Sequence, residues 1–330
     1  MAALRREGVT AFTDKAGRNW SLHTYGSMVL RTTSRQAEVL AILTENPDHD
    51  LYQISKHGTT CKLCAAYEGR VYSRSGTDPD FPPLAAAFGK MDKNGPDTLE
   101  NSWLNIHPNC LHQLIRWTPM GRSEEELQKI KDFSSFQKNP VTRDPRTEKQ
   151  IDAYRKKESA RARFLRDYRQ WERYRETIGG SVPKRFETFR KHKAADDEKY
   201  RFWRLDYRRQ NELLQHPERA LPGAASATAA EAKFTKYFFN PDSKDGYPKG
   251  IAFSSRFGYN ANNWELMRQE ILGAAQKYPA VYKATTEFGD KYSQDVVLYG
   301  RKGTPGNVRI GWLVGKDGSV HLTTAHMEEI

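Results

Sequence analysis

The chain has 330 residues, of which 37% are hydrophobic and 28% are charged, and it carries a net charge of +12. No stretch approaches the ~18 consecutive apolar residues that a membrane span requires, and residues 1–20 lack the apolar run of a signal peptide. We therefore expect a soluble protein that is made in the cytoplasm, has no membrane partner and folds into two or three domains. The positive charge favours a polyanionic partner, because Lys and Arg side chains release condensed counterions when they bind phosphates.

Residues 1–120 have the turn chemistry of a compact, loop-rich domain. The hydroxyl-rich segment Thr33-Ser34-Arg35-Gln36 precedes apolar residues at helical spacing and predicts a helix that begins there. Short apolar runs such as Gly69–Tyr72 are bounded by breakers, among them Pro82-Pro83. This pattern indicates a small unit with little long regular structure.

All three cysteines of the chain lie in this domain, and three is an odd number for a disulfide framework. Cys61 and Cys64 form one pair with two residues between them. His107 and Cys110 form a second pair at the same spacing. Each pair can present two ligands from one tight turn, so together they predict a closed four-ligand shell around a structural zinc ion, with His112 as an alternative to His107. The other interpretations are a redox CxxC, which leaves the second pair without a role, and a set of buried free cysteines.

Residues 121–220 are predicted to form a basic helical region. From residue 142 to 215 the chain has 22 Lys and Arg against 13 Asp and Glu, which accounts for nine of its twelve excess positive charges. Gly179-Gly180 divides this region into two predicted helices, roughly 146–178 and 184–214. Aromatic residues form a stripe on the first helix that we expect to pack against a partner helix, with stacking on bases as the alternative. The residues that we predict to bind nucleic acid are Arg161, Arg163, Arg166, Arg169, Arg173, Lys184 and Arg185.

Residues 221–230 are small, uncharged and punctuated by Pro and Gly, which predicts a linker. A separate C-terminal domain is expected over residues 231–330. In it, a helix is predicted to begin at Trp264, and Gly315–Gly318 predicts a hairpin turn. Alternating apolar runs predict three strands, at 292–298, 308–314 and 320–324. A helix followed by such strands indicates an antiparallel sheet with a helix across one face.

Several N-terminal segments carry a family resemblance. They are Arg31–Arg35, Asp50-Leu51, Ser55–His57, Thr60-Cys61, Cys64, Glu68–Ser73, Phe81–Leu84 and Asn105–His112. Over about residues 10–120 the chain resembles the phage minor capsid protein 2 family, relatives of Mu-type head morphogenesis proteins. The resemblance implies a virion component of low copy number whose partners are the portal or other capsid proteins and packaged DNA.

The C-terminal domain has a second resemblance. It is carried by Lys233–Pro241, Lys249, Phe257–Tyr259, Asn262–Trp264, Gly289–Tyr292 and Leu322–Thr324. These segments resemble an uncharacterised domain found at the ends of phage minor capsid proteins and of contact-dependent toxins. Its order of helix and strands is similar to that of the barnase, colicin and RelE ribonuclease toxins, which implies host RNA as a partner.

Metal-independent RNA cleavage requires a group that takes the 2′-hydroxyl proton, a cation beside the phosphorane and an acid for the leaving oxygen. The candidate residues are His326 or His321 for proton transfer, Lys249, Lys291 and Arg309 for the phosphate, and Thr323 and Thr324 for its orientation. Each also has a structural interpretation, as a solvated strand residue, a residue beside a turn or part of a frayed terminus.

The sequence thus predicts an α+β multi-domain protein with a small zinc-stabilised N-terminal domain, long basic helices and a C-terminal domain of a helix and an antiparallel sheet. Two functions stay open. The first is a structural protein of the phage head, associated with DNA or the portal, with an appended C-terminal domain of toxin type. The second is a prophage-encoded toxin whose C-terminal domain is a metal-independent ribonuclease. The first function places the protein in the virion, and the second places it in the host cytoplasm.

Overall fold

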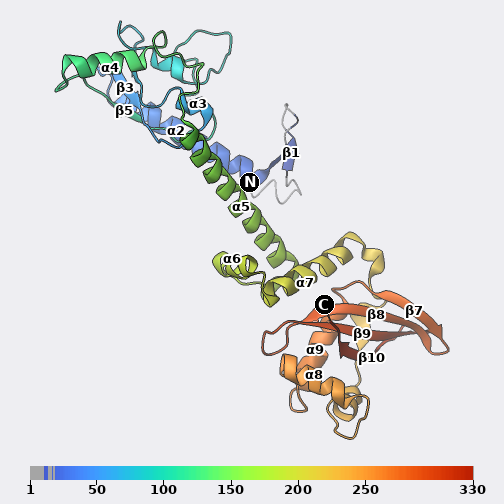
Figure 1. Ribbon diagram of the computed structural model, residues 1–330. Helices are drawn as coiled ribbons and strands as arrows, with labels where there is room; N and C mark the ends of the chain where they lie inside the picture. Colours follow the sequence, from blue (N-terminus) through green and yellow to red (C-terminus); the bar gives the residue numbers. More distant parts are fainter. Residues whose placement is uncertain (1–10, 14–16, 18, 330) are drawn as a thin grey trace. The chain divides into compact units, whose positions relative to one another are not determined.

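The structure, a computed structural model, describes residues 11–13, 17 and 19–329 (Figure 1). The chain divides into two compact units, Met1–Ala160 and Arg161–Ile330. The architecture is α+β, which confirms the predicted fold class. No helix in the described part of the chain is long and apolar enough to cross a membrane.

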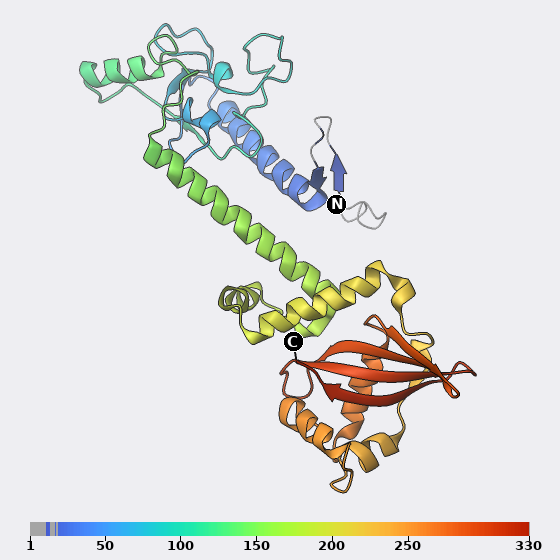
Figure 2. The ribbon, with the colours of Figure 1, turned by 45° about the vertical axis from the view of Figure 1, so that its right-hand side comes forward.

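The N-terminal unit is built around a small antiparallel sheet of order β4-β3-β5. Its elements are a hairpin of β1 (Ala11–Thr13) and β2 (Asn19–Ser21), then α2 (Leu22–Glu45), β3 (Leu51–Ile54), α3 (Lys62–Ala65), β4 (Val71–Ser73), the 3-10 helix η1 (Leu84–Ala87), β5 (Leu114–Arg116) and α4 (Glu124–Ser134). Helix α2 contributes Val39 and Leu43 to a core that includes Tyr52, Tyr72 and Leu84. Much of the chain between β4 and β5 is loop, as Figure 2 shows.

Helix α2 begins at Leu22, well before the start predicted at Thr33. The hydroxyl of Thr32 donates to the carbonyl oxygen of Met28 at 2.8 Å, one turn earlier, and does not cap the helix. Leu22, in the first turn of α2, is buried, so the part of the helix before Thr33 also packs in the protein. A hydroxyl-rich segment inside a helix therefore has the same local signature as one at its start.

The N-terminal unit continues past the boundary predicted at residue 120. The guanidinium of Arg70 is buried and donates to the carbonyl oxygens of Ser134 at 3.3 Å and Asn139 at 2.8 Å. Arg146 donates to the carbonyl oxygen of Thr60 at 3.1 Å. These bonds attach α4 and the segment after it to the residues that surround the cysteines.

The basic region forms three helices, α5 (Glu148–Ile178), α6 (Phe186–Ala195) and α7 (Glu198–Gln215). The first predicted helix agrees with α5, whereas the second is divided in two. Asp196 adopts a left-handed conformation with φ of +43°, which ends α6. The carboxylate of Asp197 then accepts from the backbone N–H of Tyr200 at 3.0 Å and caps α7.

Part of the aromatic stripe of α5 packs against the following helices, as expected, whereas Phe164 stays exposed. Trp171 and Tyr174 are buried in one cluster with Phe186, Phe189 and Trp203 from the two following helices. Their rings are therefore not free to stack on bases.

The C-terminal domain contains a five-stranded sheet of order β6-β10-β9-β8-β7. Its elements are the 3-10 helices η2 (Gly179–Ser181), η3 (Pro217–Arg219) and η4 (Ala224–Ser226), β6 (Ala227–Thr228), the π-helix η5 (Lys233–Phe238), α8 (Tyr247–Phe257), α9 (Trp264–Ala275), β7 (Val281–Thr286), β8 (Gly289–Leu298), β9 (Gly306–Gly315) and β10 (Val320–Met327). The predicted strands correspond to β8, β9 and β10. Because β6 runs parallel to β10, the sheet is mixed and not wholly antiparallel. Figure 2 shows α8 and α9 on one face of the sheet, where Phe253, Met267 and Ile271 are buried in one core with Trp312.

The segment predicted as a linker, residues 221–230, is part of the C-terminal domain. Leu221 and Ala229 are buried in its core, and β6 pairs with Val320 and His321 of β10. Small apolar residues suit a packed edge as well as a flexible linker, so composition alone does not distinguish them.

Helix α7 covers part of the opposite face of the sheet. Phe202 and Leu205 form a buried cluster with Val297 of β8. The carboxylate of Asp206 accepts from the hydroxyls of Tyr278 and Tyr299, both at 2.7 Å. The sheet is therefore enclosed by elements that begin before the predicted start of the domain at residue 231.

Candidate functional sites

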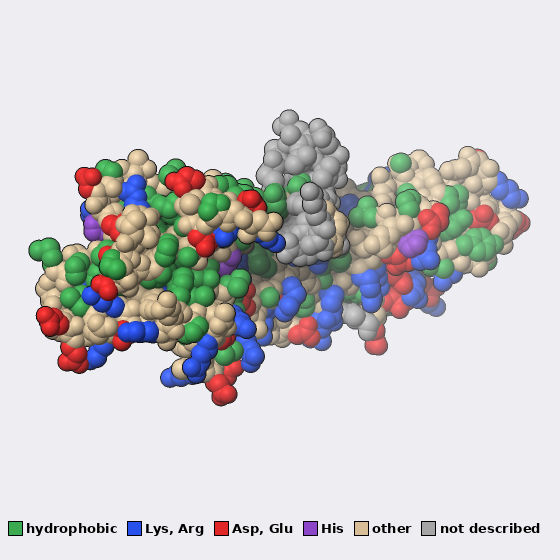
Figure 3. Space-filling view, turned by 90° about the horizontal axis from the view of Figure 1, so that it is seen from above, with side chains coloured by type: hydrophobic (Ala, Val, Ile, Leu, Met, Phe, Trp, Pro, Cys, Tyr) green, Lys and Arg blue, Asp and Glu red, His purple; other side chains and the backbone are tan. Residues whose placement is uncertain are grey.

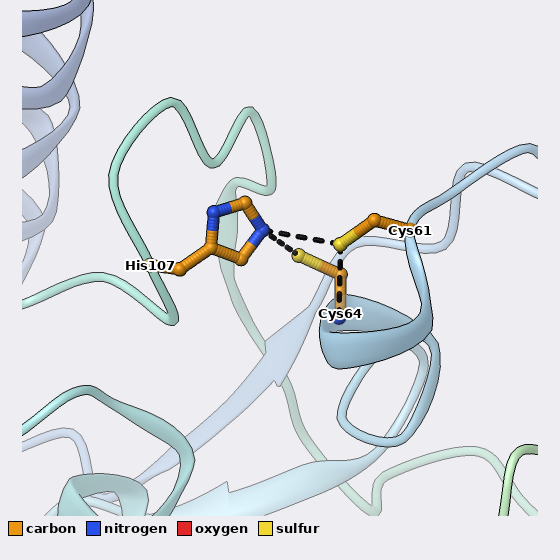
Figure 4. Close-up of side chains that lie close together, drawn as sticks. All are labelled: Cys61, Cys64 and His107. Atoms are coloured by element: carbon orange, nitrogen blue, oxygen red, sulfur yellow. Dashed lines mark hydrogen bonds between the residues drawn. The ribbon is translucent and has the colours of Figure 1, made fainter. Parts of the chain in front are cut away.

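The N-terminal unit brings the predicted ligands together from two segments. Cys61 is the N-cap of α3, and its sulfur accepts from the backbone N–H of Cys64 at 3.4 Å, so one helical turn presents both thiols. His107 and Cys110 share a second turn, in which the N–H of Cys110 donates to the carbonyl oxygen of His107 at 3.0 Å. Asn109 adopts φ of +65° there, a conformation that Asn tolerates better than most residues. Figure 4 shows the His107 ring directed at two sulfur atoms.

The predicted ligands fall into two groups that share Cys64. In the first, Cys61, Cys64 and His107 have ligand atoms within 4.8 Å of one another, and His107 Nε2 lies 3.2 Å from Cys61 Sγ and 3.0 Å from Cys64 Sγ. Cys110 belongs to the second group, and its Sγ lies 3.7 Å from Cys64 Sγ. Zinc ligands at about 2.3 Å for sulfur and about 2.0 Å for nitrogen stand roughly 3.5–3.8 Å apart at tetrahedral corners, so the sulfur–sulfur distance fits this spacing and the two nitrogen–sulfur distances are shorter. Three thiolates and one imidazole would close the shell and leave no position for water.

The three thiols lie too close together to be ionised at once without a cation. The hydrogen bond with Cys64 lowers the pKa of Cys61 to about 3 and that of Cys110 to about 4. The same bonds raise the pKa of Cys64, which keeps its proton. A bound cation would take the place of that proton and stabilise all three thiolates.

A fifth donor, His112, lies beside the four predicted ligands. Its Nδ1 is 3.5 Å from Cys110 Sγ, and its Nε2 is 2.9 Å from the buried carboxylate of Glu68. Cys64, Cys110 and His112 form a second group whose ligand atoms lie within 4.8 Å of one another. Burial disfavours the charged imidazole, but hydrogen bonds to Cys110 and Glu68 outweigh this effect and raise the pKa of His112 to about 9. Both histidines are therefore placed to serve as the nitrogen ligand.

The seven residues predicted to bind nucleic acid all have exposed side chains. Arg161, Arg163, Arg166, Arg169 and Arg173 lie on α5, and Lys184 and Arg185 immediately precede α6. Figure 3 shows Lys and Arg side chains (blue) among Asp and Glu side chains (red) on the face that it draws.

The C-terminal domain brings Lys249 to Tyr237 and to Thr324 of the sheet. Lys249 lies on α8, and its Nζ is 3.0 Å from Tyr237 Oη and 3.4 Å from Thr324 Oγ1. Thr323 is the extra residue of a bulge in β10, opposite Gly311 of β9. A Cβ at Gly311 would lie 2.7 Å from Thr323 Oγ1, so the missing side chain makes room for the threonine.

Arg309 and His326 are cross-strand neighbours whose side chains are already paired with acids. Arg309 donates from Nε to Asp295 at 2.7 Å, and its terminal nitrogen is 3.1 Å from Glu328. His326 Nε2 lies 3.0 Å from the same Glu328 carboxylate. The bond to Arg309 holds the pKa of Asp295 below its usual value. These two candidates are thus less available to a phosphate than the sequence suggested.

The remaining candidates lie elsewhere on the sheet. Lys291 is an exposed residue of β8, opposite Leu313 of β9, and forms no ion pair with any residue that the structure describes. His321 contacts the hydroxyls of Thr228 at 2.8 Å and Ser319 at 3.0 Å. The predicted catalytic residues therefore do not form one site. Lys249 contacts Thr324, Arg309 and His326 share an ion-paired group, and Lys291 and His321 lie apart from both.

Two residues of these clusters were not among the predicted site residues. Glu68 contacts His112 across 44 positions of sequence, and Tyr237 contacts Lys249 across 12. Both lie in segments that carry the two resemblances, and that was the available signal. No spacing rule joins an acid to a histidine so far along the chain.

Comparisons with known proteins match the N-terminal and the C-terminal parts of the chain separately. The family model described as phage minor capsid protein 2 matches residues 1–178, which is more than half of the chain. A model described as a domain of unknown function (DUF6883) matches residues 220–329. No curated protein matches the chain.

One solved structure to which the chain is similar is a contact-dependent growth inhibition toxin–immunity protein complex from Klebsiella pneumoniae 342. The identity is 18%, the match covers 33% of this chain and 100% of that chain, and the TM-score is 0.27. A TM-score of this size does not establish a shared fold. The family model, by contrast, matches more than half of the chain, over residues 1–178. This match shows that the chain belongs to the phage minor capsid protein 2 family.

Proposed function

We propose that this protein is a structural component of the phage head, in which zinc fixes the N-terminal unit and the portal or other capsid proteins are the partners. The observation that carries the proposal is the pair of Cys/His groups that share Cys64, inside the segment that matches the family. Such a donor set binds zinc as a structural ion and contributes the binding free energy to folding. The proposal places the protein in the virion.

Elemental analysis of the purified chain tests the metal. We expect about one zinc per chain, because the two Cys/His groups share Cys64 and one ion can use that thiolate. Cys61→Ser should reduce the zinc content to near zero, and His107→Ala and His112→Ala should show which imidazole is the ligand. His216→Ala removes an exposed histidine on the second unit and is the matched control. A well-folded chain that lacks zinc would refute the proposal.

Purified phage particles test the location. Mass spectrometry of intact virions should detect this chain, and cross-linking should join it to portal or capsid proteins. If the protein is produced in infected cells but is absent from purified particles, the structural role is wrong.

For the basic region we propose DNA as the partner. The seven exposed cationic residues and the regional excess of positive charge support this interpretation. Replacing Arg163 and Arg166 with Gln should reduce the slope of log affinity against log salt concentration by about 2, because each phosphate contact contributes about 0.9. Lys244→Gln with Lys316→Gln removes the same charge elsewhere and is the control. Equal slopes for both variants would point to a protein partner.

The second candidate function is ribonuclease activity of the C-terminal domain. One geometric observation favours it: Thr324 and His326 are two positions apart on β10 and therefore on one face, with Arg309 opposite His326 and Lys249 in contact with Thr324. Cations, hydroxyls and an imidazole thus lie along one strip of sheet, as metal-independent phosphodiester cleavage requires.

Expression of the full chain tests this activity, because α7 and residues 221–230 are packed onto the domain and a shorter piece would expose its core. We expect growth arrest with RNA cleavage that disappears in His326→Ala. Lys283→Ala, a change of an exposed lysine on β7 of the same sheet, should leave the cleavage intact. Intact RNA at high expression of the full chain would exclude the ribonuclease.

A further inference from the structure

Lys249 differs from the other half-buried cations of the sheet in its partners. Its ammonium contacts two neutral oxygens, Tyr237 Oη at 3.0 Å and Thr324 Oγ1 at 3.4 Å. Within the described residues it forms no ion pair, whereas Arg309 is paired with both Asp295 and Glu328. A partly desolvated cation without a counter-ion gains more from an incoming anion than a fully hydrated one.

A second cation lies at the same tyrosine. Lys233 Nζ is 4.9 Å from the centroid of the Tyr237 ring, and Lys249 Nζ is 5.5 Å from it. The ring is attractive to each ammonium and brings both to one place. Two positive charges therefore converge around the Tyr237 hydroxyl, which is itself a hydrogen-bond donor when an acceptor is near.

The backbone around Tyr237 packs unusually closely against the start of α8. Tyr237 lies on the π-helix η5, a conformation that is rare and often found at functional sites. A Cβ at Gly246 would lie 2.2 Å from the carbonyl oxygen of Tyr237, and one at Gly250 would lie 1.7 Å from that of Phe238. Only glycines allow α8 to pack this tightly on η5, and this packing sets Lys249 against Tyr237.

We infer that Tyr237, Lys249 and Thr324 form a binding site for a phosphate group, with Lys233 as a second source of positive charge. An ammonium and two hydroxyls offer three donors to the oxygens of one tetrahedral anion, and the bulged Thr323 adds a fourth beside them. The inference rests on the proposed ribonuclease only for its biological ligand, the phosphodiester of an RNA strand. Free phosphate has the same chemistry, and the experiment separates the two sources.

Calorimetric titration of the full chain tests the site with three probes. They are inorganic phosphate, a tetranucleotide RNA whose 2′-O-methyl groups prevent cleavage, and the same sequence as DNA. Lys249→Met should weaken binding at least about tenfold, and Tyr237→Phe should weaken it about threefold to tenfold, since bonds to charged groups are stronger than neutral ones. Lys236→Met removes an exposed lysine of the same π-helix and should change affinity less than about twofold, a change within the range of a surface charge.

The outcomes decide between this site and the basic helices, which all variants retain. Equal affinities of Lys249→Met and Lys236→Met would overturn the site, even if RNA is cleaved. Tyr237→Phe keeps the ring and its packing, so a loss in that variant with an unchanged melting temperature supports the site independently of folding. Binding without cleavage of unmodified RNA would reject the ribonuclease and retain the site. Tighter binding of RNA than of inorganic phosphate would identify the polynucleotide as the source, and the reverse would identify free phosphate.

Discussion

The N-terminal unit and the C-terminal domain reach a defined structure by different means. The main core of the N-terminal unit has nine buried residues, whereas that of the C-terminal domain has twenty. In the N-terminal unit, non-covalent contacts also join loops that are distant in the sequence, at the Cys/His cluster and at Arg70. The C-terminal domain instead encloses its sheet with helices on both faces. One region thus combines a smaller core with polar contacts and a group of donors that could hold a metal ion, whereas the other has the larger buried core.

Removal of zinc should have the largest effect and should separate the two regions. Structural zinc in small domains contributes about 10–16 kcal/mol of apparent binding free energy, which is comparable to or larger than the stability of a typical domain. We expect a chelator to remove amide protection from residues 51–117 and to leave that of β8, β9 and β10 unchanged. Hydrogen exchange read by mass spectrometry measures both regions in one sample. Retained protection of 51–117 in a zinc-free chain would show that burial suffices there as well.

Trp312→Ala should have the converse effect. Trp312 is fully buried, and its indole N–H donates to Gln294 at 2.8 Å. Truncation of a buried tryptophan costs about 3–5 kcal/mol, so the C-terminal domain should unfold at lower denaturant concentration while the zinc content stays at one. Phe288→Ala, a change of a side chain that is 69% exposed, is the control. A shift of both regions together would mean that they unfold as one unit.

Asp206→Ala tests whether α7 stabilises the sheet that it covers. Asp206 is buried and accepts hydrogen bonds from Tyr278 and Tyr299, so its loss removes one bond from each hydroxyl, although Tyr278 keeps its contact with the carbonyl oxygen of Val297 at 3.1 Å. We expect a destabilisation of about 2–4 kcal/mol, seen as faster amide exchange in α7 and β8. Asp245→Ala, at an exposed position, should have little effect. Unchanged exchange in α7 would contradict its assignment to the domain.

The same carboxyl predicts a pH dependence. Burial raises the pKa of Asp206, and the bonds from the tyrosines and Gln210 offset this only in part. The folded state therefore holds the proton more tightly than the unfolded state, whose pKa is about 3.9. As pH rises from that value through the raised pKa, the native chain should lose stability relative to Asp206→Asn. Parallel stability curves of the two proteins would contradict the shift.

The sequence predicted elements well wherever the pattern is local. The strands β8, β9 and β10 and helix α5 follow from alternation and helical spacing, and the ligand pairs follow from CxxC spacing. Boundaries were less well predicted where the same residues suit two structures. Residues 221–230 are small, uncharged and punctuated by Pro and Gly, which predicts a linker, yet Leu221 and Ala229 are buried in the core of the C-terminal domain.

The candidate sites were predicted in part, for a similar reason. The spacing of the cysteines predicted that they lie close together, and in the structure they do, in two groups that share Cys64. Which histidine joins which cysteines depends on the path of a loop that no local rule specifies. Among the C-terminal candidates, sequence could not show that Asp295 and Glu328 would pair with Arg309 and His326. These contacts depend on strand register and on a bulge at Thr323, which are properties of the folded sheet.

Glu68→Gln should have the smallest effect of these changes, and it tests whether polar contacts around the cluster matter beyond the ligands. The carboxylate of Glu68 is 7% exposed, lies 2.9 Å from His112 Nε2 and also accepts from the backbone N–H of His57 at 3.1 Å. An acid that orients a histidine beside a metal shell typically changes metal affinity tenfold to about a hundredfold when it is lost. Competition with a chromophoric chelator should therefore show weaker zinc binding by Glu68→Gln, with the stoichiometry still at one.

Glu45→Gln is the control, because it removes the same charge at an exposed end of α2. It should leave the zinc affinity within about twofold, as expected for a surface residue. A loss in Glu68→Gln but not in Glu45→Gln would mean that the N-terminal unit depends on a layer of hydrogen bonds around its ion. Equal affinities would restrict that dependence to the ligands themselves. Because Glu68 and His112 are 44 positions apart in the sequence, such a layer would also explain how loops without a large core hold the Cys/His groups together.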